Sequence, residues 1–331
     1  MERASVRWGI VSTANIGRAV IPALHAASHA EVVAVASRDG ERARAFADEL
    51  SIPTAYSAYE ALLEADNIDA VYIPLPNSLH RDWAIRFAEA GKHVLCEKPL
   101  ALDAAECAEM SAAAAANGVC LMEAFMYRFH PRTEKVIDLV RNGVIGPLQS
   151  LTASFTFPLS RAGDIRNQPE LGGGALMDVG CYCVNVARTL ANAEPIEVQA
   201  TANWSNTGVD DQMAGTLRFD SGLLAQLECA LTLPRRQHYE AAGRDGYLQV
   251  ASAFRPDGDD TDIVVYDSEG NEPEVHRIAN NDEYRLMVEH FTHCVVTGTD
   301  PRYPVAEAAA NMRVIEALYR AARSGKSERV S

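Results

Sequence analysis

The first 125 residues alternate between two kinds of segment, and this alternation is the feature that most restricts the fold. Continuous apolar runs that suit buried strands are separated by longer stretches of helical character. The apolar runs read VRWGIVS, EVVAVAS, AVYIPLP, HVLCE and VCLMEA. Strands buried on both faces appear as unbroken apolar runs, and strands that alternate with helices build a parallel sheet. Residues 1–125 are therefore predicted to form an α/β domain, a doubly wound parallel sheet of the Rossmann type.

The pattern changes after residue 145. Shorter runs of alternating hydrophobicity follow one another and are joined by Gly, Asp and Asn turns, most clearly the hairpin around Asp220-Ser221-Gly222. One helical stretch, GGGALMDVGCYCVNVARTLAN, interrupts them, and two more close the chain. We expect residues 126–331 to form an α+β domain with a large, mainly antiparallel open sheet. Because an uncovered sheet face often pairs with another copy, we assign this domain to substrate binding and to assembly as a homodimer or homotetramer.

Charge and cysteine content restrict the class of protein. The net charge of -15, with no basic run to offset it, argues against a nucleic-acid partner, which requires phosphate neutralisation. The apolar runs are too short to span a membrane, and the N-terminus lacks the features of a secretory signal. The chain has seven cysteines, an odd number that cannot all pair in disulfides within one chain. This favours a location in the reducing cytoplasm. Cys181-x-Cys183 has no second pair at zinc spacing, so no metal site is expected.

The turn after the first predicted strand lies where a Rossmann domain meets the pyrophosphate of its cofactor. It reads Ser12-Thr13-Ala14-Asn15-Ile16-Gly17, with Ser12 and Ala14 in place of the first two glycines of G-x-G-x-x-G. Small residues still let the backbone approach a phosphate, and Gly17 permits close packing of helix on strand. By itself the turn is equally typical of a tight strand-to-helix connection without a ligand.

The end of the second predicted strand bears on the choice of cofactor. An NAD-binding domain offers an acidic residue there to the ribose hydroxyls. This chain has Ser37-Arg38 instead, with Asp39 one step later. A hydroxyl and a guanidinium suit a 2′-phosphate, since both form charge-assisted hydrogen bonds with it. NADP is therefore predicted over NAD; the alternative is a solvated arginine beside the next turn.

The stretch HVLCEKPLALD places a charged pair, Glu97 and Lys98, at the end of a buried strand. Ligands bind at the carboxyl ends of strands in such sheets. Further along, Asp178 and Tyr182 lie four residues apart in an apolar helix and share one face. An ammonium group lowers the pKa of a nearby phenol, which makes a tyrosine usable as an acid or base for hydride transfer. A structural pair of Asp178 with Lys98 beside a core tyrosine would explain the spacing equally well.

The quoted elements occur together in one known family. The chain resembles the Gfo/Idh/MocA oxidoreductases in AVYIPLPNSLH, AGKHVLCEKPLALD, MEAFMYRFHP and GGGALMDVGCY, with spacing kept from Val6 to the last helix. The passage ASFTFPLSRAGDIRNQPELGGGALMDVGCY is most similar to the branch of NADP-dependent D-xylose dehydrogenases, dimeric dihydrodiol dehydrogenases and 3-ketosugar reductases.

The resemblance implies roles for particular residues. It makes Tyr182 the acid/base, Lys98 its electrostatic partner, and Asp178 a group that binds a substrate hydroxyl or orients the pair. The alternatives are local packing for His80 and core packing for Tyr284. The positions that match the family's NADP(H) contacts are Ser12, Thr13, Ala14, Asn15, Ile16, Ser37, Arg38, Leu75, Pro76, Asn77, His80, Glu97, Lys98, Arg166 and Tyr284.

Other polar side chains are weaker candidates for contact with a sugar, namely Arg128, His130, Asn167 and His238. For Arg128 a salt bridge that ties the two domains together is the favoured alternative.

Together these observations predict a cytoplasmic, NADP-dependent enzyme that transfers a hydride between the nicotinamide and a pyranose-like sugar or polyol. The first choice is a C1 dehydrogenase for an aldose of the D-xylose type. A C3 reductase of a 3-keto sugar, free or nucleotide-linked, and a trans-dihydrodiol dehydrogenase are the alternatives among enzymes. A catalytically dead NADP-binding regulator is the alternative outside them.

Overall fold

The computed structural model describes residues 5–161, 163–256, 261–271, 273–279 and 281–330. The chain divides into two compact units that are not contiguous in sequence. The first unit consists of Met1–Phe129 and Asp282–Ala309, and the second of His130–Asn281 and Ala310–Ser331. The sequence-based division at residue 125 leaves the segment from Asp282 to Ala309 with the second part of the chain, whereas the structure packs it with the first unit.

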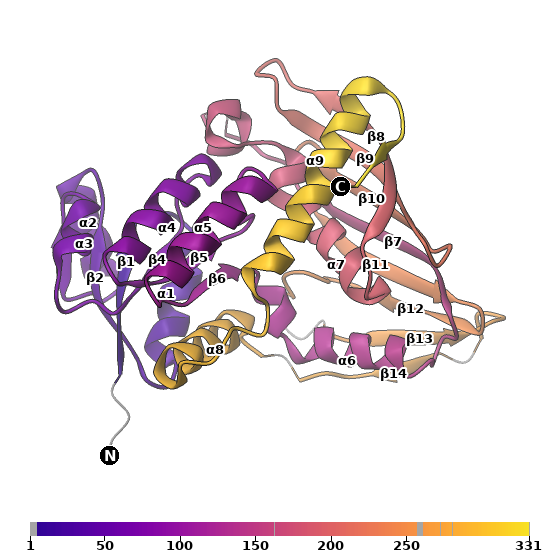
Figure 1. The fold of residues 1–331 in the computed structure, drawn as a ribbon. Helices are drawn as coiled ribbons and strands as arrows, with labels where there is room; N and C mark the ends of the chain where they lie inside the picture. The colour runs from indigo at the N-terminus through magenta and orange to yellow at the C-terminus, as the bar shows by residue number, and fades with distance from the viewer. Residues whose placement is uncertain (1–4, 162, 257–260, 272, 280, 331) are drawn as a thin grey trace. The chain divides into compact units, whose positions relative to one another are not determined.

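The first unit is built on a parallel six-stranded sheet with the strand order β3-β2-β1-β4-β5-β6 (Figure 1). This order reverses direction between β1 and β4, as in a doubly wound Rossmann domain, and confirms the predicted fold. The strands are β1 (Val6–Val11), β2 (Ala30–Ala36), β3 (Thr54–Tyr56), β4 (Ala70–Ile73), β5 (His93–Glu97) and β6 (Leu121–Ala124).

Helices connect these strands, and α8 joins them from far along the chain. α8 packs against α1, and its Phe291 meets the fully buried Trp8 of β1 with ring centroids 5.3 Å apart. The helices of the unit are α1 (Gly17–Ala26), α2 (Gly40–Glu49), α3 (Glu60–Glu64), α4 (His80–Glu89), α5 (Ala104–Ala116) and α8 (Glu283–Thr297), with short 3-10 turns η1 (Asn77–Leu79) and η2 (Met126–Phe129).

The second unit contains a nine-stranded sheet with the order β14-β13-β12-β11-β7-β10-β9-β8-β15. β7 and β10 pair in parallel and the other neighbours are antiparallel, which confirms the predicted mainly antiparallel sheet. The strands are β7 (Leu148–Thr156), β8 (Pro195–Trp204), β9 (Asp210–Phe219), β10 (Leu224–Ala230), β11 (Arg236–Gly243), β12 (Gly246–Val250), β13 (Ile263–Asp267), β14 (Glu274–His276) and β15 (Glu328–Arg329).

Helices cover one face of this sheet. A π-helical turn, η5 (Leu176–Gly180), runs directly into α7 (Cys181–Ala191), and both pack on β7 and β10. α9 (Val305–Ser324) begins in the first unit and continues in the second, where Leu318 packs on β9. The remaining elements are α6 (Pro131–Arg141), η3 (Ile165–Asn167) and η4 (Pro169–Leu171).

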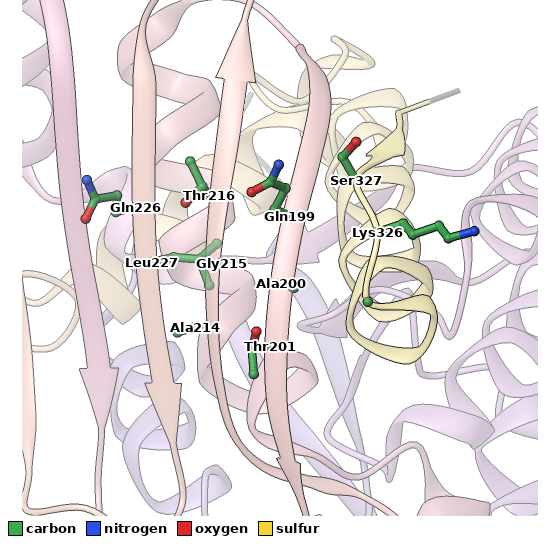
Figure 2. Close-up of a pocket in the computed structure, with 11 residues that line it drawn as sticks. Gln199, Ala200, Thr201, Ala214, Gly215, Thr216, Gln226, Leu227, Lys326 and Ser327 are labelled. Atoms are coloured by element: carbon green, nitrogen blue, oxygen red, sulfur yellow. The ribbon is translucent and has the colours of Figure 1, made fainter.

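The other face of the nine-stranded sheet carries polar side chains. Gln199, Thr216 and Gln226 lie in register on β8, β9 and β10, and Figure 2 shows them on neighbouring strands. They line a hollow to which Lys326 and Ser327 also contribute. The described lining of this hollow offers no acid, histidine or tyrosine, so it is not suited to proton transfer. Of the helices in the described part of the chain, none is long and apolar enough to cross a membrane.

The turn from β1 into α1 has an unusual backbone conformation at Ser12. Ser12 has a φ of 113°, in the region that favours glycine, and it takes the place of the first glycine of the dinucleotide motif. Its hydroxyl donates to the Pro74 carbonyl and accepts from the Ala14 amide, both at 3.2 Å. The turn thus has the backbone of a glycine and two side-chain hydrogen bonds that a glycine could not make.

Ser12→Ala should therefore lower the free energy of unfolding by roughly 1–3 kcal/mol, because it keeps the strained φ and loses both hydrogen bonds. Ser12→Gly loses the same bonds but relieves the strain, so it should stay within about 1 kcal/mol of the parent protein. Urea denaturation of both variants, with the exposed Ser28→Ala as control, measures the difference. Equal stability of the alanine and glycine variants would contradict this account.

Candidate active site

The end of β2 presents a hydroxyl and a guanidinium, while the nearby acid is already engaged. Ser37 is buried and Arg38 is exposed. Asp39 caps α2, since its carboxylate accepts hydrogen bonds from the backbone amides of Glu41 at 3.0 Å and Arg42 at 3.1 Å. The carboxylate is therefore used by the helix, and this end of the strand suits a phosphate better than a ribose diol.

Arg42 is a further candidate that sequence reasoning missed. It lies one helical turn after Arg38, and its Nη2 approaches the carbonyl oxygen of Thr13 in the β1–α1 turn at 3.5 Å. The guanidinium thus bridges the two segments predicted to hold the cofactor. The four-residue spacing from Arg38 at the start of a helix was the signal that could have found it.

The loops that follow β4 and β5 are joined by His80. Its ring is fully buried, with Nε2 at 2.8 Å from the Leu75 carbonyl and Nδ1 at 3.0 Å from the Pro99 carbonyl. A neutral imidazole has one N–H, so one of these contacts is a donated hydrogen bond. Burial lowers the pKa of His80 and favours this neutral form. Any effect of His80 on a cofactor therefore passes through the two loops that it connects.

The predicted pair at the end of β5 is part of a polar group inside the first unit. Glu97 accepts a hydrogen bond from the hydroxyl of Tyr72 at 2.6 Å and another from the backbone amide of Lys98 at 3.2 Å. Lys98 is half-buried, and its peptide bond to Pro99 is cis. Burial, and then the charge of Glu97, raise the pKa of Tyr72 well above its usual value, so Tyr72 remains a neutral donor.

Tyr284, at the start of α8, lies within electrostatic reach of Tyr72 and is 9% exposed. Tyr72 itself was not among the predicted site residues. Its phenol in the otherwise apolar run AVYIPLP was the signal that pointed to it. The first unit therefore gathers Tyr72, Glu97, Lys98 and Tyr284 near the carboxyl ends of β4 and β5.

In the second unit, Arg166 is held between two acids. Its Nε lies 2.5 Å from Asp178 Oδ2 and its Nη1 lies 3.1 Å from Asp164 Oδ1. The charge of Asp178 is the main reason that the pKa of Arg166 is raised. The structure thus brings together Arg166 and Asp178, two of the predicted site residues, and gives Asp178 a cationic partner within its own unit.

Tyr182 follows Asp178 by one turn and is embedded in aromatic side chains. It is 3% exposed, with ring centroids 5.2 Å from Phe155 and 5.3 Å from Phe254. The turn between Asp178 and Tyr182 is π-helical, a feature that is frequent at functional sites. The second unit therefore places the predicted acid/base and its acidic neighbour on one irregular helix.

The glycines before this helix permit a very close approach. Gly172 and Gly174 have φ values of 74° and 120°, in the region that favours glycine. A Cβ on Gly173 would overlap the carbonyl oxygen of Arg166, and the Gly174 amide donates to that oxygen at 2.9 Å. The turn thereby fixes Arg166 beside the helix that carries Asp178.

The polar residues named above as weaker candidates for sugar contact have other positions or partners in the structure. His238 is exposed on the open sheet face, in register with Ser154, whereas its neighbour Tyr239 is buried on the helix-covered side. His130 caps α6 by accepting from the Arg132 amide at 3.0 Å. The structure does not bring His238 together with Tyr182.

Arg128 is bound within the first unit. Its guanidinium lies 3.6 Å from the ring centroid of Tyr303 and 3.4 Å from a carboxylate oxygen of Glu307. The salt bridge thus exists, but its partner belongs to the same unit. Asn167 ends the short turn η3 and donates to the Arg161 carbonyl at 3.3 Å.

Comparison with known proteins agrees with this arrangement. Residues 6–125 match the Gfo/Idh/MocA oxidoreductase family with an NAD-binding Rossmann fold, and residues 133–249 match the Gfo/Idh/MocA C-terminal domain. A D-xylose 1-dehydrogenase (NADP+) of Haloferax volcanii is 45% identical over 96% of this chain and 98% of its own length. A mouse trans-1,2-dihydrobenzene-1,2-diol dehydrogenase is 32% identical over 94% of this chain and 95% of its own.

One of the similar solved structures is a 3-ketoreductase of Actinomadura kijaniata in complex with NADP and TDP-benzene. It superposes with a TM-score of 0.90 at 34% identity, over 96% of this chain and 98% of that one. The matches span both units and nearly the whole chain. The protein therefore belongs to the Gfo/Idh/MocA family of oxidoreductases.

Proposed function

We propose that the protein, an NADP-dependent oxidoreductase, oxidises C1 of a D-xylose-like aldose. The observation that carries the proposal is the 45% identity, over nearly full length, with a D-xylose 1-dehydrogenase (NADP+). The first unit would hold the cofactor and the second the sugar. The seven cysteines, all within the described residues, lie outside disulfides, which accords with a reducing cytoplasm.

The residues of the first unit fit NADP. Arg38 and Arg42 would form charge-assisted hydrogen bonds with the 2′-phosphate, while Asp39 is occupied at the start of α2. Ser12 and the residues after it would face the pyrophosphate, as in other Rossmann domains. When bound, NADP+ supplies the acceptor for the hydride.

The remaining chemistry belongs to side chains of this chain. Tyr182 would take the proton of the C1 hydroxyl as the hydride leaves C1, and the oxidised sugar would be the lactone. Lys98 would stabilise the phenolate form of Tyr182 that takes this proton, and also the negative charge that develops on the sugar oxygen. Asp178, oriented by its contact with Arg166, would accept a hydrogen bond from a neighbouring sugar hydroxyl.

A second candidate function is the reduction of a 3-keto sugar. It is favoured by the similarity to the 3-ketoreductase that was solved with NADP and TDP-benzene. A trans-dihydrodiol dehydrogenase is favoured on the same footing by the mouse relative. A catalytically dead regulator would have no need to retain Lys98, Asp178 and Tyr182 in its sequence.

The polar open face of the nine-stranded sheet supports pairing with a second copy, as a homodimer or homotetramer. Light scattering on the protein as it elutes from a size-exclusion column measures the mass of the assembly directly. A monomeric mass would contradict this part of the proposal.

The substrate is tested by incubating the protein with NADP+ and a panel of D-xylose, L-arabinose, D-glucose and D-ribose, followed by absorbance of NADPH. We expect turnover to be fastest with D-xylose. A parallel assay offers NADPH and a TDP-linked 3-keto sugar. Reduction of the keto sugar without oxidation of any aldose would replace the first proposal by the second.

The cofactor site is tested at Arg38. Arg38→Ala should weaken NADP binding by about 10- to 100-fold and leave NAD binding nearly unchanged, because one charge-assisted hydrogen bond contributes roughly 1.5–3 kcal/mol. Quenching of tryptophan fluorescence gives both dissociation constants. Arg44→Ala, an exposed arginine on α2, the helix that follows Arg38, is the matched control. Equal affinity of the parent protein for NAD and NADP would contradict the assignment.

The acid/base is tested at Tyr182. Tyr182→Phe keeps the ring and removes the proton carrier, so NADP should still bind while turnover falls by roughly 10²- to 10⁴-fold. Tyr239→Phe, a buried tyrosine 6.2 Å from the same Phe254 ring, is the control and should keep its activity.

Lys98→Met tests the electrostatic partner. Removal of the cation should shift the pH optimum of the residual activity upward, since an ammonium group near a phenol lowers its pKa. The double variant with Tyr182→Phe should be little worse than the poorer single variant, because groups that act as a unit are not additive. Fully additive losses would mean that the two residues act independently.

A further inference from the structure

The helix that carries Asp178 and Tyr182 starts at a buried carboxylate. Asp210 of β9 is 1% exposed and accepts a hydrogen bond from the backbone amide of Leu176 at 2.7 Å. Leu176 is the first residue of the π-helical turn that contains Asp178. The first amides of a helix lack partners within it, so this bond fixes where the turn begins.

Asp210 is itself held by α9. The hydroxyl of Tyr319 donates to Asp210 Oδ1 at 2.7 Å. A Cβ on Gly174 would overlap the same oxygen and would lie 3.0 Å from the Tyr319 hydroxyl. The close contact therefore depends on a glycine at this position, and it joins β9, α9 and the start of the π-helical turn.

A second buried contact follows the π-helical turn. Asn311 of α9 is 1% exposed, and its Nδ2 donates to the carbonyl oxygen of Cys181 at 3.2 Å. Its Oδ1 accepts from Arg188 at 3.3 Å, and Arg188 is in turn paired with Glu194 at 2.7 Å. Two side chains of α9 thus act on the backbone at both ends of Leu176–Gly180, one through Asp210 and one directly.

We call Asp210 and Tyr319 the anchor of the π-helical turn, and several titratable groups act on this pair. Burial raises the pKa of Asp210 to about 6, against the effect of the two hydrogen bonds that it accepts. Burial, and then the charge of Asp210, raise the pKa of Tyr319 well above its usual value, so Tyr319 remains a neutral donor. The other titratable groups that act on the pair are Asp211, Cys229 of β10 and Arg323 of α9.

We propose that Asp210, Tyr319 and Asn311 are positioning residues for the reaction, which hold the π-helical turn so that Asp178 and Tyr182 keep their spacing. The inference rests on the proposed function, because it assigns the chemistry to those two side chains. A π-helical turn closes its hydrogen bonds over one more residue than an α-helical turn and is stable only where its surroundings hold it. The two contacts supply that support from the buried side of the helix.

Hydrogen exchange of the intact protein tests the anchor without any substrate. Tyr319→Phe and Asp210→Ala should speed exchange of the amides of Leu176–Gly180 by about tenfold or more. Asp210→Asn should stay close to the parent protein, since its amide oxygen still accepts from Leu176 and its amide group can donate to Tyr319. Tyr247→Phe, in the same unit, is the control.

Turnover of D-xylose with NADP+ tests the consequence. Tyr319→Phe and Asp210→Ala should lower kcat by about 10- to 100-fold, because a small misplacement of a reacting group slows the chemical step strongly. The dissociation constant of NADP should stay within about twofold, and the isotope effect with D-xylose deuterated at C1 should rise. Asp210→Asn should restore most of the activity.

The outcomes separate this inference from the proposed function. If Tyr182→Phe is inactive while Tyr319→Phe and Asp210→Ala exchange and turn over as the parent does, the anchor is wrong and the catalytic assignment stands. These two variants could also have a lower Tm but an unchanged kcat at temperatures well below that Tm. The residues would then have only a structural role. If Tyr182→Phe keeps full activity, the catalytic assignment fails and the positioning role falls with it. If the parent protein does not oxidise D-xylose, the substrate is wrong, and hydrogen exchange alone decides the anchor.

Discussion

A parallel sheet that is buried on both faces can present polar side chains to a ligand only where its strands end, and the first unit depends on this constraint. β4 is wholly buried, and Asn77 and His80 of the predicted cofactor site lie in the turn and the helix that follow it. Glu97 and Lys98 stand where β5 ends, and His80 connects the backbone after β4 to the backbone after β5. The loops are therefore held by buried polar contacts, and a cofactor would meet a surface that is already ordered.

In the second unit the main constraint is on the irregular helix formed by η5 and α7, which must be held in one position. Gly173 lets the chain before this helix touch the backbone of Arg166, and Gly174 lets it touch the carboxylate of Asp210. These contacts leave no room for a side chain, so the local order comes from backbone packing. The acid Asp178 then receives its cation from Arg166, within the same unit. Asp178 thus pairs with Arg166, while Tyr182, one turn later, packs among aromatic rings.

Sequence reasoning found the long elements with a clear hydrophobic pattern. It missed short elements and those whose buried positions include polar residues. β3 has three residues and α3 has five, too few for a period to show. β11, which reads RQHYEAAG, was missed because its buried positions include Gln237, which is satisfied by the backbone of Arg255. α6 was not among the predicted helices, although Pro131 opens it and His130 caps it. For β11 the deciding contact comes from Arg255, 18 residues further along the chain than Gln237.

By itself the sequence determined the two fold classes, the unusual first turn, the basic end of β2 and the charged pair after β5, because these are local patterns of residue type and spacing. Tertiary structure alone decided the rest. It placed α8 on the first unit through Trp8 and Phe291, made Asp39 a helix cap, and paired Asp178 with Arg166. It also brought Asp210 to the start of the helix that bears Tyr182. The physical reason is that burial and hydrogen bonding act between residues that are close in space, and spacing along the chain does not record that closeness.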